Sequence, residues 1–410
     1  MPIPRALTKE VLARIEPTKE ERQKALQKVE SFLKALNAEL KRQKIKANAV
    51  LGGSYAKDTW LSGDYDVDVF VQFDLSLKEK NLSDLLERAL KKWQFERIHG
   101  SRDYFWVRDT HRFEIVPVLK LKKSSDAQNV TDFSPLHVKW VNDKGAKYKG
   151  DIRLIKKFCK ASRCYGAESY IRGFSGHVVD ILVIFYRGFL PLLNAATKWE
   201  PKVVLDYSKV YKGNALLMLN TSKTEGPMVL VDPVQPERNA AAALTDENLT
   251  RFIEAAKSFL KKPGVSFFEE QEINFVKLAK KGHLVRVKVQ SEEGKEDVSG
   301  TKLVRAFEFV RDRLTDFQVV DSGWVWDKKE KGEWYFVLKT AELPKIEEWK
   351  GPPVELKSAV DKFKQLYKNT FTKSGRVWAR VPRTECKVTD VLARLLMDEY
   401  VRLRVRSAKL

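Results

Sequence analysis

Residues 51–71 read LGGSYAKDTWLSGDYDVDVFV, and this stretch decides the fold of the first part of the chain. An apolar strand is expected to end at Gly52-Gly53-Ser54, where a short helix opens. Backbone N–H groups at such a helix start bind anions, and glycine lets a phosphate approach closely. Lys57, one helical turn on, can add a cation for a triphosphate. Gly-Gly-Ser is also ordinary turn chemistry, so this segment alone leaves both interpretations open.

The pair Asp66 and Asp68 is the second part of the stretch. Residues two apart on a strand point to the same face, while Val67 and Val69 fill the other. Neighbouring carboxylates repel each other, which raises one pKa unless a cation lies between them. Two divalent ions ~3.5–4 Å apart in such a site bind an attacking hydroxyl and a departing pyrophosphate. Asp64 follows a glycine in the turn and is expected to be solvated.

A third carboxylate is expected from the segment RFEIVPVLKL at residues 112–121. Glu114 lies between Phe113 and Ile115 in an apolar strand, where an acid needs a partner. A buried ion pair with Arg112 or Lys120 is one explanation. We favour a metal site, because it also accounts for the repelling aspartate pair.

The charge balance points to a polyanionic partner. The 410 residues contain 76 Lys and Arg against 55 Asp and Glu, a net charge of +21, which is typical of nucleic-acid binders. A thermophile-like surface would explain the charged fraction of 32%, but it would not explain the excess of positive over negative residues. The cysteines lack the paired spacing of a zinc site, and neither a disulfide scaffold nor a structural zinc is expected; they are Cys159, Cys164 and Cys386.

The rest of the chain predicts a mixed α+β protein of several domains. A long helix should begin at the capping box Thr18-x-x-Glu21. Its apolar face is expected to contain Leu26, Val29, Phe32, Leu33, Leu36 and Leu40. Further elements are expected as a strand near 48–53, a strand at 66–73, a helix around 82–93, a hairpin at 104–121, and helices at 151–164 and 245–262.

The apolar segment at residues 177–199 is expected to form one buried helix, because charged residues interrupt it too often for a membrane span. With no signal peptide, the expected location is the cytoplasm. The last part should contain a strand at 283–290, a hairpin at 324–338, a linker at 349–355 and a strand at 401–406. Arg402, Arg404 and Arg406 would share one side of that strand. Aromatics beside cations suit RNA, although most of them are expected in the core.

Taken together, the motifs resemble the polymerase-β-type nucleotidyltransferase superfamily. Within it, the chain is similar to the archaeal class I CCA-adding enzymes. The likeness rests on GGSYAKDTWL with DYDVDVFV, on residues 153–189, and on VDPVQPERNAAAAL at residues 231–244. It implies a polymerase-β-like catalytic head at 1–150, a helical neck at 151–262, and an α+β body and tail that binds tRNA at 263–410.

The resemblance also implies roles for particular residues. The metal ligands would be Asp66, Asp68 and Glu114. The nucleotide contacts would be Gly53, Ser54, Lys57, Ser134, His137, Lys156, Tyr165 and Arg238. Against the family pattern, Asp66 and Glu114 exchange the lengths of two carboxylates, and Lys57 stands where an arginine is expected.

The residues themselves leave alternatives open for four of these positions. Lys156 could lie on a solvated basic face, and Tyr165 could simply pack against its neighbours. His137 could be a satisfied interior histidine, while Arg238 could form an interdomain salt bridge.

The implied reaction adds CCA to the 3′ end of tRNA from CTP and ATP with two Mg²⁺ ions. The expected partners are the tRNA acceptor arm and the two nucleotides, without a membrane. Whether the chain works as a monomer or a homodimer is left open. The alternatives are a poly(A) polymerase, an oligoadenylate-synthase-like enzyme, and a non-catalytic RNA-binding protein.

Overall fold

The computed structural model describes residues 5–108 and 111–410. These form two compact units, one up to Gln271 and one from Glu272 onward. Helices and several separate sheets alternate along the chain, which confirms the predicted α+β multidomain class. The finer division into a head, a neck and a body stays a prediction.

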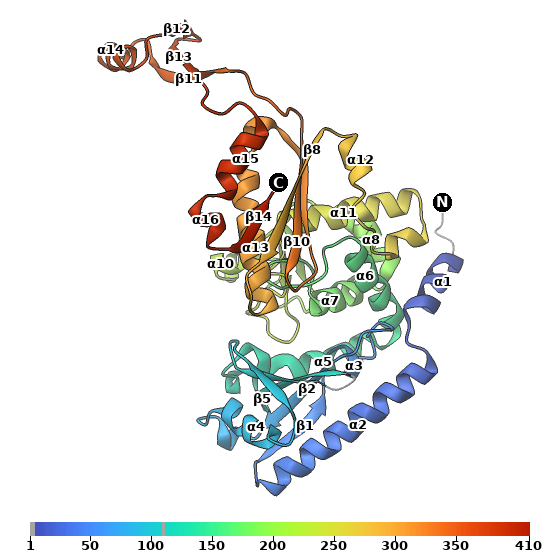
Figure 1. Ribbon diagram of the computed structural model, residues 1–410. Coiled ribbons are helices and arrows are strands. Elements are labelled where there is room, and N and C mark those ends of the chain that lie inside the picture. Colours follow the sequence, from blue (N-terminus) through green and yellow to red (C-terminus); the bar gives the residue numbers. More distant parts are fainter. Residues whose placement is uncertain (1–4, 109–110) are drawn as a thin grey trace. The chain divides into compact units, whose positions relative to one another are not determined.

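A five-stranded sheet with the order β1-β2-β5-β4-β3 forms the centre of the first part (Figure 1). The strands are β1 (Ala47–Leu51), β2 (Asp66–Phe73), β3 (Phe95–Ile98), β4 (Tyr104–Arg108) and β5 (Arg112–Leu119). β2 and β5 are parallel, and the other neighbours are antiparallel. The predicted strand at 66–73 and the pairing of the predicted hairpin are confirmed. Asp109 and Thr110, in the predicted hairpin turn, lie outside the described residues.

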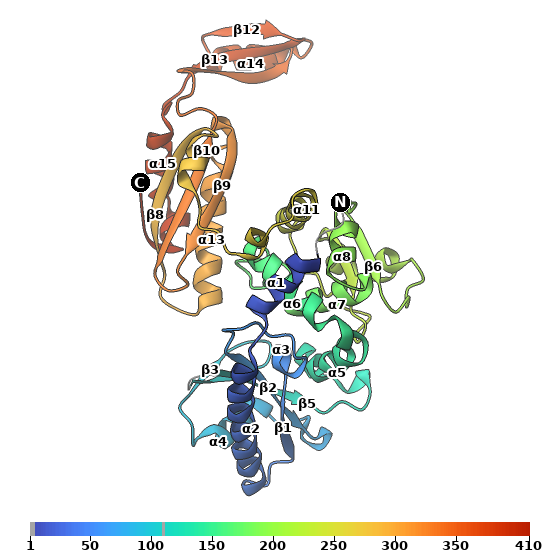
Figure 2. The ribbon, with the colours of Figure 1, turned by 90° about the vertical axis from the view of Figure 1, so that its right-hand side faces the viewer.

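Two helices, α2 (Lys19–Arg42) and α4 (Leu82–Leu90), cover one face of this sheet (Figure 2). α2 begins at the predicted capping box, where Thr18 Oγ1 accepts the N–H of Glu21 at 3.1 Å. The placement of Leu26 in the core is wrong, because this side chain is 44% exposed. Ala25 takes the core position, since the buried stripe continues through Val29.

Helices and a small parallel sheet follow the five-stranded sheet in the same unit. They are α5 (Ser134–Gly145), α6 (Lys149–Ala161), α7 (Gly176–Tyr186), α8 (Phe189–Ala196), β6 (Val203–Asp206), α9 (Ala215–Met218), α10 (Thr221–Thr224), β7 (Met228–Val231) and α11 (Asp246–Lys261). The apolar faces of α6, α7, α8 and α11 share one core, which α1 (Arg5–Ile15) also joins. α5 lies on the sheet face opposite α2 and α4 (Figure 1), where its Val138 packs against Phe70 and Val116.

The apolar segment at 177–199 is two helices, so the expectation of one continuous helix is wrong. Arg187 and Gly188 adopt positive φ values of 62° and 131°, which ends α7, and the N–H of Phe189 then donates to Asp151 at 2.9 Å to start α8. Among the described residues, no single helix has the length and apolarity to cross a membrane. α7 and α8 reach that length only together, and they are bent by 94°.

The second unit contains two antiparallel sheets. The larger has the order β14-β8-β10-β9, and the smaller has the order β11-β13-β12. Its elements are α12 (Phe275–Ala279), β8 (His283–Ser291), α13 (Glu296–Asp312), β9 (Val319–Trp326), β10 (Lys331–Leu338), β11 (Ile346–Pro353), α14 (Lys357–Leu366), β12 (Thr370–Lys373), β13 (Arg376–Pro382), α15 (Val388–Leu396), α16 (Glu399–Arg402) and β14 (Val405–Lys409). The predicted alternation on β8 is confirmed, because Val287 is buried while Arg286 and Lys288 are exposed.

Two predictions for this unit are wrong. Residues 349–355 are no linker, because β11 pairs with β13 through Lys350 and its register shifts only before Pro353. Residues 401–406 are not one strand, because α16 holds Arg402 and β14 begins at Val405. Arg404 instead lies 3.4 Å from the centroid of the Tyr400 ring.

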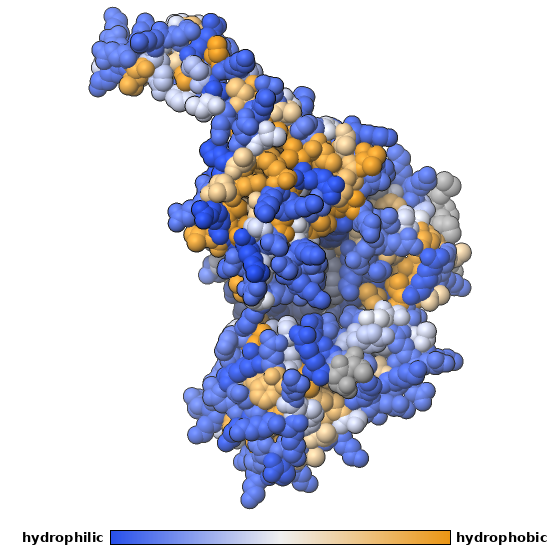
Figure 3. Space-filling model, viewed as in Figure 1, coloured by the Kyte–Doolittle hydropathy of each residue, from blue (hydrophilic) through white to orange (hydrophobic). Residues whose placement is uncertain are grey.

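Hydrophilic side chains cover most of the face seen in Figure 3, including the surfaces of α2, α4 and α14. Apolar side chains gather around α15 and β8 in the same view. Exposed apolar residues of this unit include Met397, which follows α15, at 68% and Leu403, which follows α16, at 64%. The polar surface fits the strong positive balance of the sequence.

Candidate active site

The predicted carboxylates lie side by side on β2 and β5. In the parallel register of these strands Asp68 pairs with Glu114, and Asp66 pairs with Arg112. Neighbouring strands are ~4.8 Å apart, so paired side chains on one face are adjacent. Asp68 and Glu114 share the face opposite the buried Val67 and Val69. The structure therefore brings the predicted acids together on one face of the sheet.

Burial raises the pKa of Asp68 to about 7, and repulsion from Glu114 adds to the effect. Burial also raises the pKa of Glu114, against the effect of Trp106, whose Nε1–H donates to Glu114 at 3.1 Å. Asp66 is more exposed and accepts from Arg112 at 2.6 Å. Of the two cations considered as partners of Glu114, Arg112 forms its ion pair with Asp66, although its charge also acts on Glu114.

These oxygen donors fit a divalent cation. Carboxylate oxygens are the ligands that Mg²⁺ prefers. A buried carboxylate next to a second one is costly, and a cation between the two removes that cost. A bound cation would offset the burial and the repulsion that raise the pKa of Asp68 and of Glu114.

Gly53 lies directly against Asp68. It begins α3 (Gly53–Ala56) with a φ of +53°, in the left-handed region that favours glycine. A Cβ atom added at this position would lie 1.5 Å from the Oδ2 atom of Asp68. The glycine therefore makes room for the carboxylate at the start of α3.

Two buried lysines adjoin this group. Lys57 Nζ donates to Asp180 of α7 at 2.7 Å, with 10% and 1% of the two side chains exposed. Lys156 Nζ donates to the carbonyl oxygen and the hydroxyl of Thr59 at 3.0 and 3.1 Å. Burial lowers the pKa of Lys156 to about 8. Lys156 is buried, so it does not lie on a solvated basic face.

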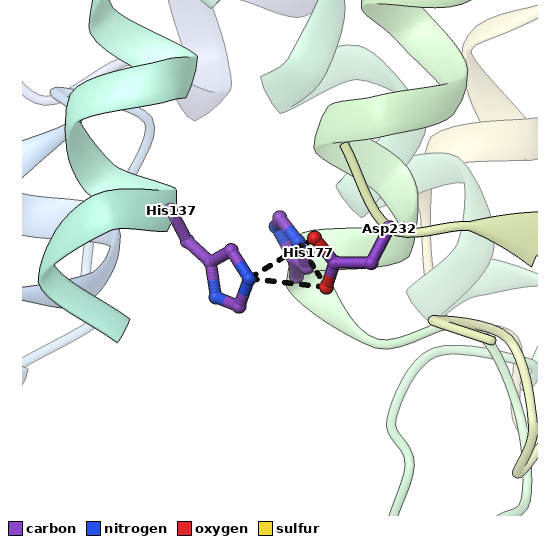
Figure 4. A group of neighbouring side chains, drawn as sticks. All are labelled: His137, His177 and Asp232. Atoms are coloured by element: carbon purple, nitrogen blue, oxygen red, sulfur yellow. Dashed lines mark hydrogen bonds and ion pairs between the residues drawn. The ribbon is translucent and has the colours of Figure 1, made fainter. Parts of the chain in front are cut away.

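A second group contains His137 of α5, His177 of α7, and Asp232 after β7 (Figure 4). His137 Nε2 lies 3.0 Å and His177 Nε2 lies 3.4 Å from Asp232 Oδ2, to which Arg238 also donates at 3.1 Å. Burial lowers the pKa of His177 to about 4. Burial acts to raise the pKa of Asp232, but its histidine partners hold that pKa well below the usual range.

Electrostatic interactions connect the two groups. Lys57 acts on both Asp68 and His177, and Lys156 also acts on Asp68. The predicted metal ligands and most of the predicted nucleotide contacts therefore belong to one region of the first unit.

The remaining predicted contacts lie at its edges. Ser134 opens α5 one turn before His137, which places both on the same side of the helix. The hydroxyl of Tyr165 lies near Gly176, because a Cβ added there would be 3.1 Å from it. Burial raises the pKa of Tyr165, and the ammonium of Lys160 lies 5.5 Å from its ring centroid.

Sequence reasoning missed three residues of this region, namely Asp180, His177 and Asp232. Asp180 lies in an apolar helix, and Asp232 follows an entirely buried strand. An acid in an apolar segment is the same signal that identified Glu114, and it could have found both aspartates. His177 carried no such signal.

Comparison with known proteins first defines the class. A family model described as "Nucleotidyltransferase domain" matches residues 26–129. These residues contain the five-stranded sheet and its carboxylates. A structure of the Cid1 poly(U) polymerase bound to MgATP has a TM-score of 0.50 and 16% identity, covering 64% of this chain and 98% of its own. A second structure of Cid1 has a TM-score of 0.50 and 15% sequence identity, and the match covers 65% of this chain and 98% of the Cid1 chain. The fold of this part of the chain is that of a nucleotidyltransferase domain.

Sequence relatives define the family more closely. Two further family models match: "tRNA nucleotidyltransferase, second domain" at residues 150–269, and "CCA-adding enzyme, C-terminal domain" at residues 281–401. The CCA-adding enzyme of Nanoarchaeum equitans is 34% identical over 82% of this chain and 83% of its own length. The CCA-adding enzyme of Thermococcus kodakarensis is 31% identical over 96% of this chain and 90% of its own length. The chain belongs to the archaeal-type CCA-adding enzymes, a family of tRNA nucleotidyltransferases.

Proposed function

We propose that the chain completes the 3′ end of tRNA by adding CMP and AMP from CTP and ATP, and that Asp66, Asp68 and Glu114 hold two Mg²⁺ ions. The observation that carries this proposal is the in-register pair of Asp68 and Glu114 against Gly53. The names of the relatives give the substrate class. The acceptor arm of tRNA would approach the carboxylate face with its 3′-hydroxyl.

Magnesium bound at these carboxylates would favour ionisation of the attacking hydroxyl and neutralise the departing pyrophosphate. The protein groups around them would orient the nucleotide. Ser54 would donate its hydroxyl to a phosphate oxygen, because it follows Gly53, which adjoins the carboxylate of Asp68. Lys57 and Lys156 would supply positive charge from the adjoining buried positions.

The residues of the second group would hold the rest of the nucleotide. His137 and Arg238 both reach Asp232, so this carboxylate would fix their positions. Ser134 and Tyr165 would complete the contacts. Selection between CTP and ATP would then depend on hydrogen-bond donors and acceptors held in place by buried contacts.

Nucleotide incorporation into tRNA transcripts truncated at successive 3′ positions tests this function. We expect incorporation of C into transcripts that lack one or both cytidines of the CCA end, and incorporation of A into transcripts that lack only the terminal nucleotide. The rate of addition should fall by about 10²–10³-fold or more in the variant Asp68→Asn. The variant Asp74→Asn, altered just beyond the far end of β2, should keep the rate of the original chain. Incorporation of A alone, or equal activity on unrelated RNA, would instead favour a poly(A) polymerase.

A further inference from the structure

The side chains of His137, His177 and Asp232, here called the His-His-Asp cluster, converge from three separate elements (Figure 4). One ligand-type atom from each lies within 4.8 Å of the others. None of these residues belongs to β2 or β5, which hold the carboxylates expected to bind magnesium. We propose that the His-His-Asp cluster is a second metal site, selective for a transition-metal ion such as Zn²⁺.

Both imidazoles lie at distances from Asp232 that match the ligand separations around a tetrahedral zinc ion. Zinc binds nitrogen and oxygen at about 2.0–2.2 Å, so two of its ligands lie roughly 3.3 Å apart. The Nε2 atoms of His137 and His177 lie 3.0 and 3.4 Å from Asp232 Oδ2. Two of the three separations thus match those around a bound zinc ion, and all three ligand atoms lie within 4.8 Å of one another.

The surroundings of His177 also point to a ligand. Both of its ring nitrogens are buried, and neither has a hydrogen-bond partner among the described residues. Buried polar atoms of this kind are rare in folded proteins and call for an explanation such as an ion. Its contact with Asp232 is at ion-pair distance but does not meet hydrogen-bond geometry.

The carboxylate of Asp232 is held in place from its other side. Its Oδ1 atom accepts the N–H groups of Val234 and Gln235 at 2.9 and 3.2 Å. Oδ2 lies near both imidazoles, and Oδ1 is also 3.2 Å from His137 Nε2. Such supporting hydrogen bonds orient ligands in known metal sites.

The chemistry of the donors separates this site from the magnesium site. Two imidazoles with one carboxylate are a zinc ligand set, whereas Mg²⁺ prefers oxygen ligands only. The three protein ligands leave the fourth position of a tetrahedron for water or a substrate atom.

Occupation of the cluster has a consequence for Arg238, which donates to the same Oδ2 atom at 3.1 Å. A bound cation would take this oxygen and repel the guanidinium. His137 would be engaged as well. Zinc would therefore inhibit nucleotide binding, a consequence that rests on the proposed function, whereas metal binding itself does not.

The test uses the full chain, freed of metal with a chelator and then saturated with Mg²⁺ to fill the carboxylates of β2 and β5. Zn²⁺ is titrated against a chromogenic chelator, and bound zinc is counted after desalting. We expect one tightly bound ion per chain. The variants His137→Gln and His177→Gln should each weaken binding by at least about tenfold. His283→Gln, an exposed histidine on β8, is the matched control and should bind as the original chain does.

Co²⁺ in place of Zn²⁺ provides a readout that needs no variant. The original chain should give the intense visible bands of four-coordinate cobalt. Weak bands of a six-coordinate ion, no zinc uptake in the presence of Mg²⁺, or unchanged uptake in both variants would overturn the site. Melting followed by circular dichroism shows that each variant is folded.

CTP binding with and without Zn²⁺ separates the site from its consequence. We expect zinc to weaken CTP binding at least about tenfold in the original chain and not in His177→Gln. Intact zinc binding with unchanged CTP affinity would overturn the inhibitory role and support the site alone. CTP binding without CCA addition would contradict the proposed function and leave the zinc result standing.

Discussion

Asp68 and Glu114 lie on neighbouring strands, and the charge of Glu114 makes ionisation of Asp68 more costly. A carboxylate that is half-protonated near neutral pH binds cations only as it gives up that proton. The pH dependence of the site therefore centres on Asp68, with a further contribution from Glu114, whose pKa burial also raises, while the more exposed Asp66 is balanced by Arg112.

The pKa of Asp68, raised to about 7, predicts how magnesium binding varies with pH. Below about pH 7 the proton on Asp68 competes with Mg²⁺, so the affinity should rise by up to about tenfold per pH unit and level off above that value. Calorimetric titration of the metal-free chain with Mg²⁺ at several pH values measures this. Asp68→Asn should lose the dependence together with most of the affinity, and Asp74→Asn should keep both. A flat profile in the original chain would contradict the assignment.

Individual site residues could be predicted where the sequence placed a charge against its surroundings. Glu114 between two buried apolar residues was such a case, and Asp66 and Asp68 on one face of a strand were another. The partners of Lys57 and His137 could not be predicted, because Asp180 and Asp232 are far away in sequence and meet them only after folding.

At the scale of the element, α3 and α7 are joined by the buried pair of Lys57 and Asp180. Lys57 follows the short helix beside the carboxylate sheet, and Asp180 lies in the apolar core helix. A buried ion pair adds little over an apolar pair of the same shape, but the loss of one partner leaves an uncompensated charge. The pair therefore fixes how the sheet and the helical core meet.

The variant Lys57→Met should destabilise the chain by about 3 kcal/mol. This is the lower end of the usual range, because Lys156 still acts on Asp180. Adding Asp180→Leu should recover most of the loss, and Lys41→Met on the exposed side of α2 should change the free energy of unfolding by about 0.5 kcal/mol at most. Urea unfolding measures all three. A double variant as unstable as the single one would show that the pair does not act as a unit.

Helices and strands with a regular spacing of apolar residues could be predicted from the sequence. Elements whose shape depends on tertiary contacts could not. The alternation of β2 and β8 and the capping box of α2 were sufficient to place them. The bend between α7 and α8 was missed, because apolar residues continue on both sides of Gly188. β11 was missed because its prolines suggested a linker, although they lie where its ladder with β13 ends.

At the scale of the whole molecule, the net charge of +21 is distributed over both units rather than in one tail. The basic face of β8 is one example, with Lys288 exposed beside buried valines. Positive charge of this kind attracts RNA mainly through phosphates, by releasing counterions. The positive charge of both units would therefore attract a polyanion along much of the chain.

This charge predicts that tRNA binding depends strongly on salt. The logarithm of the affinity should fall linearly with the logarithm of salt concentration, by about 10³-fold between roughly 50 and 200 mM if six phosphates are neutralised. Filter binding or fluorescence anisotropy with full-length tRNA measures the slope, and CTP binding in the same buffers is the comparison. An affinity for tRNA that does not change with salt concentration would show that the positive charge does not bind the phosphates of tRNA.

Gly53 and Asp68 occupy, in effect, a single volume of space. The room that one residue gives up is filled by the carboxylate of the other, so neither position can be altered without moving its neighbour. A larger residue at 53 would displace the acid before it met any other atom, and no repacking of the core could compensate. Any redesign of this carboxylate site has to begin by keeping the glycine.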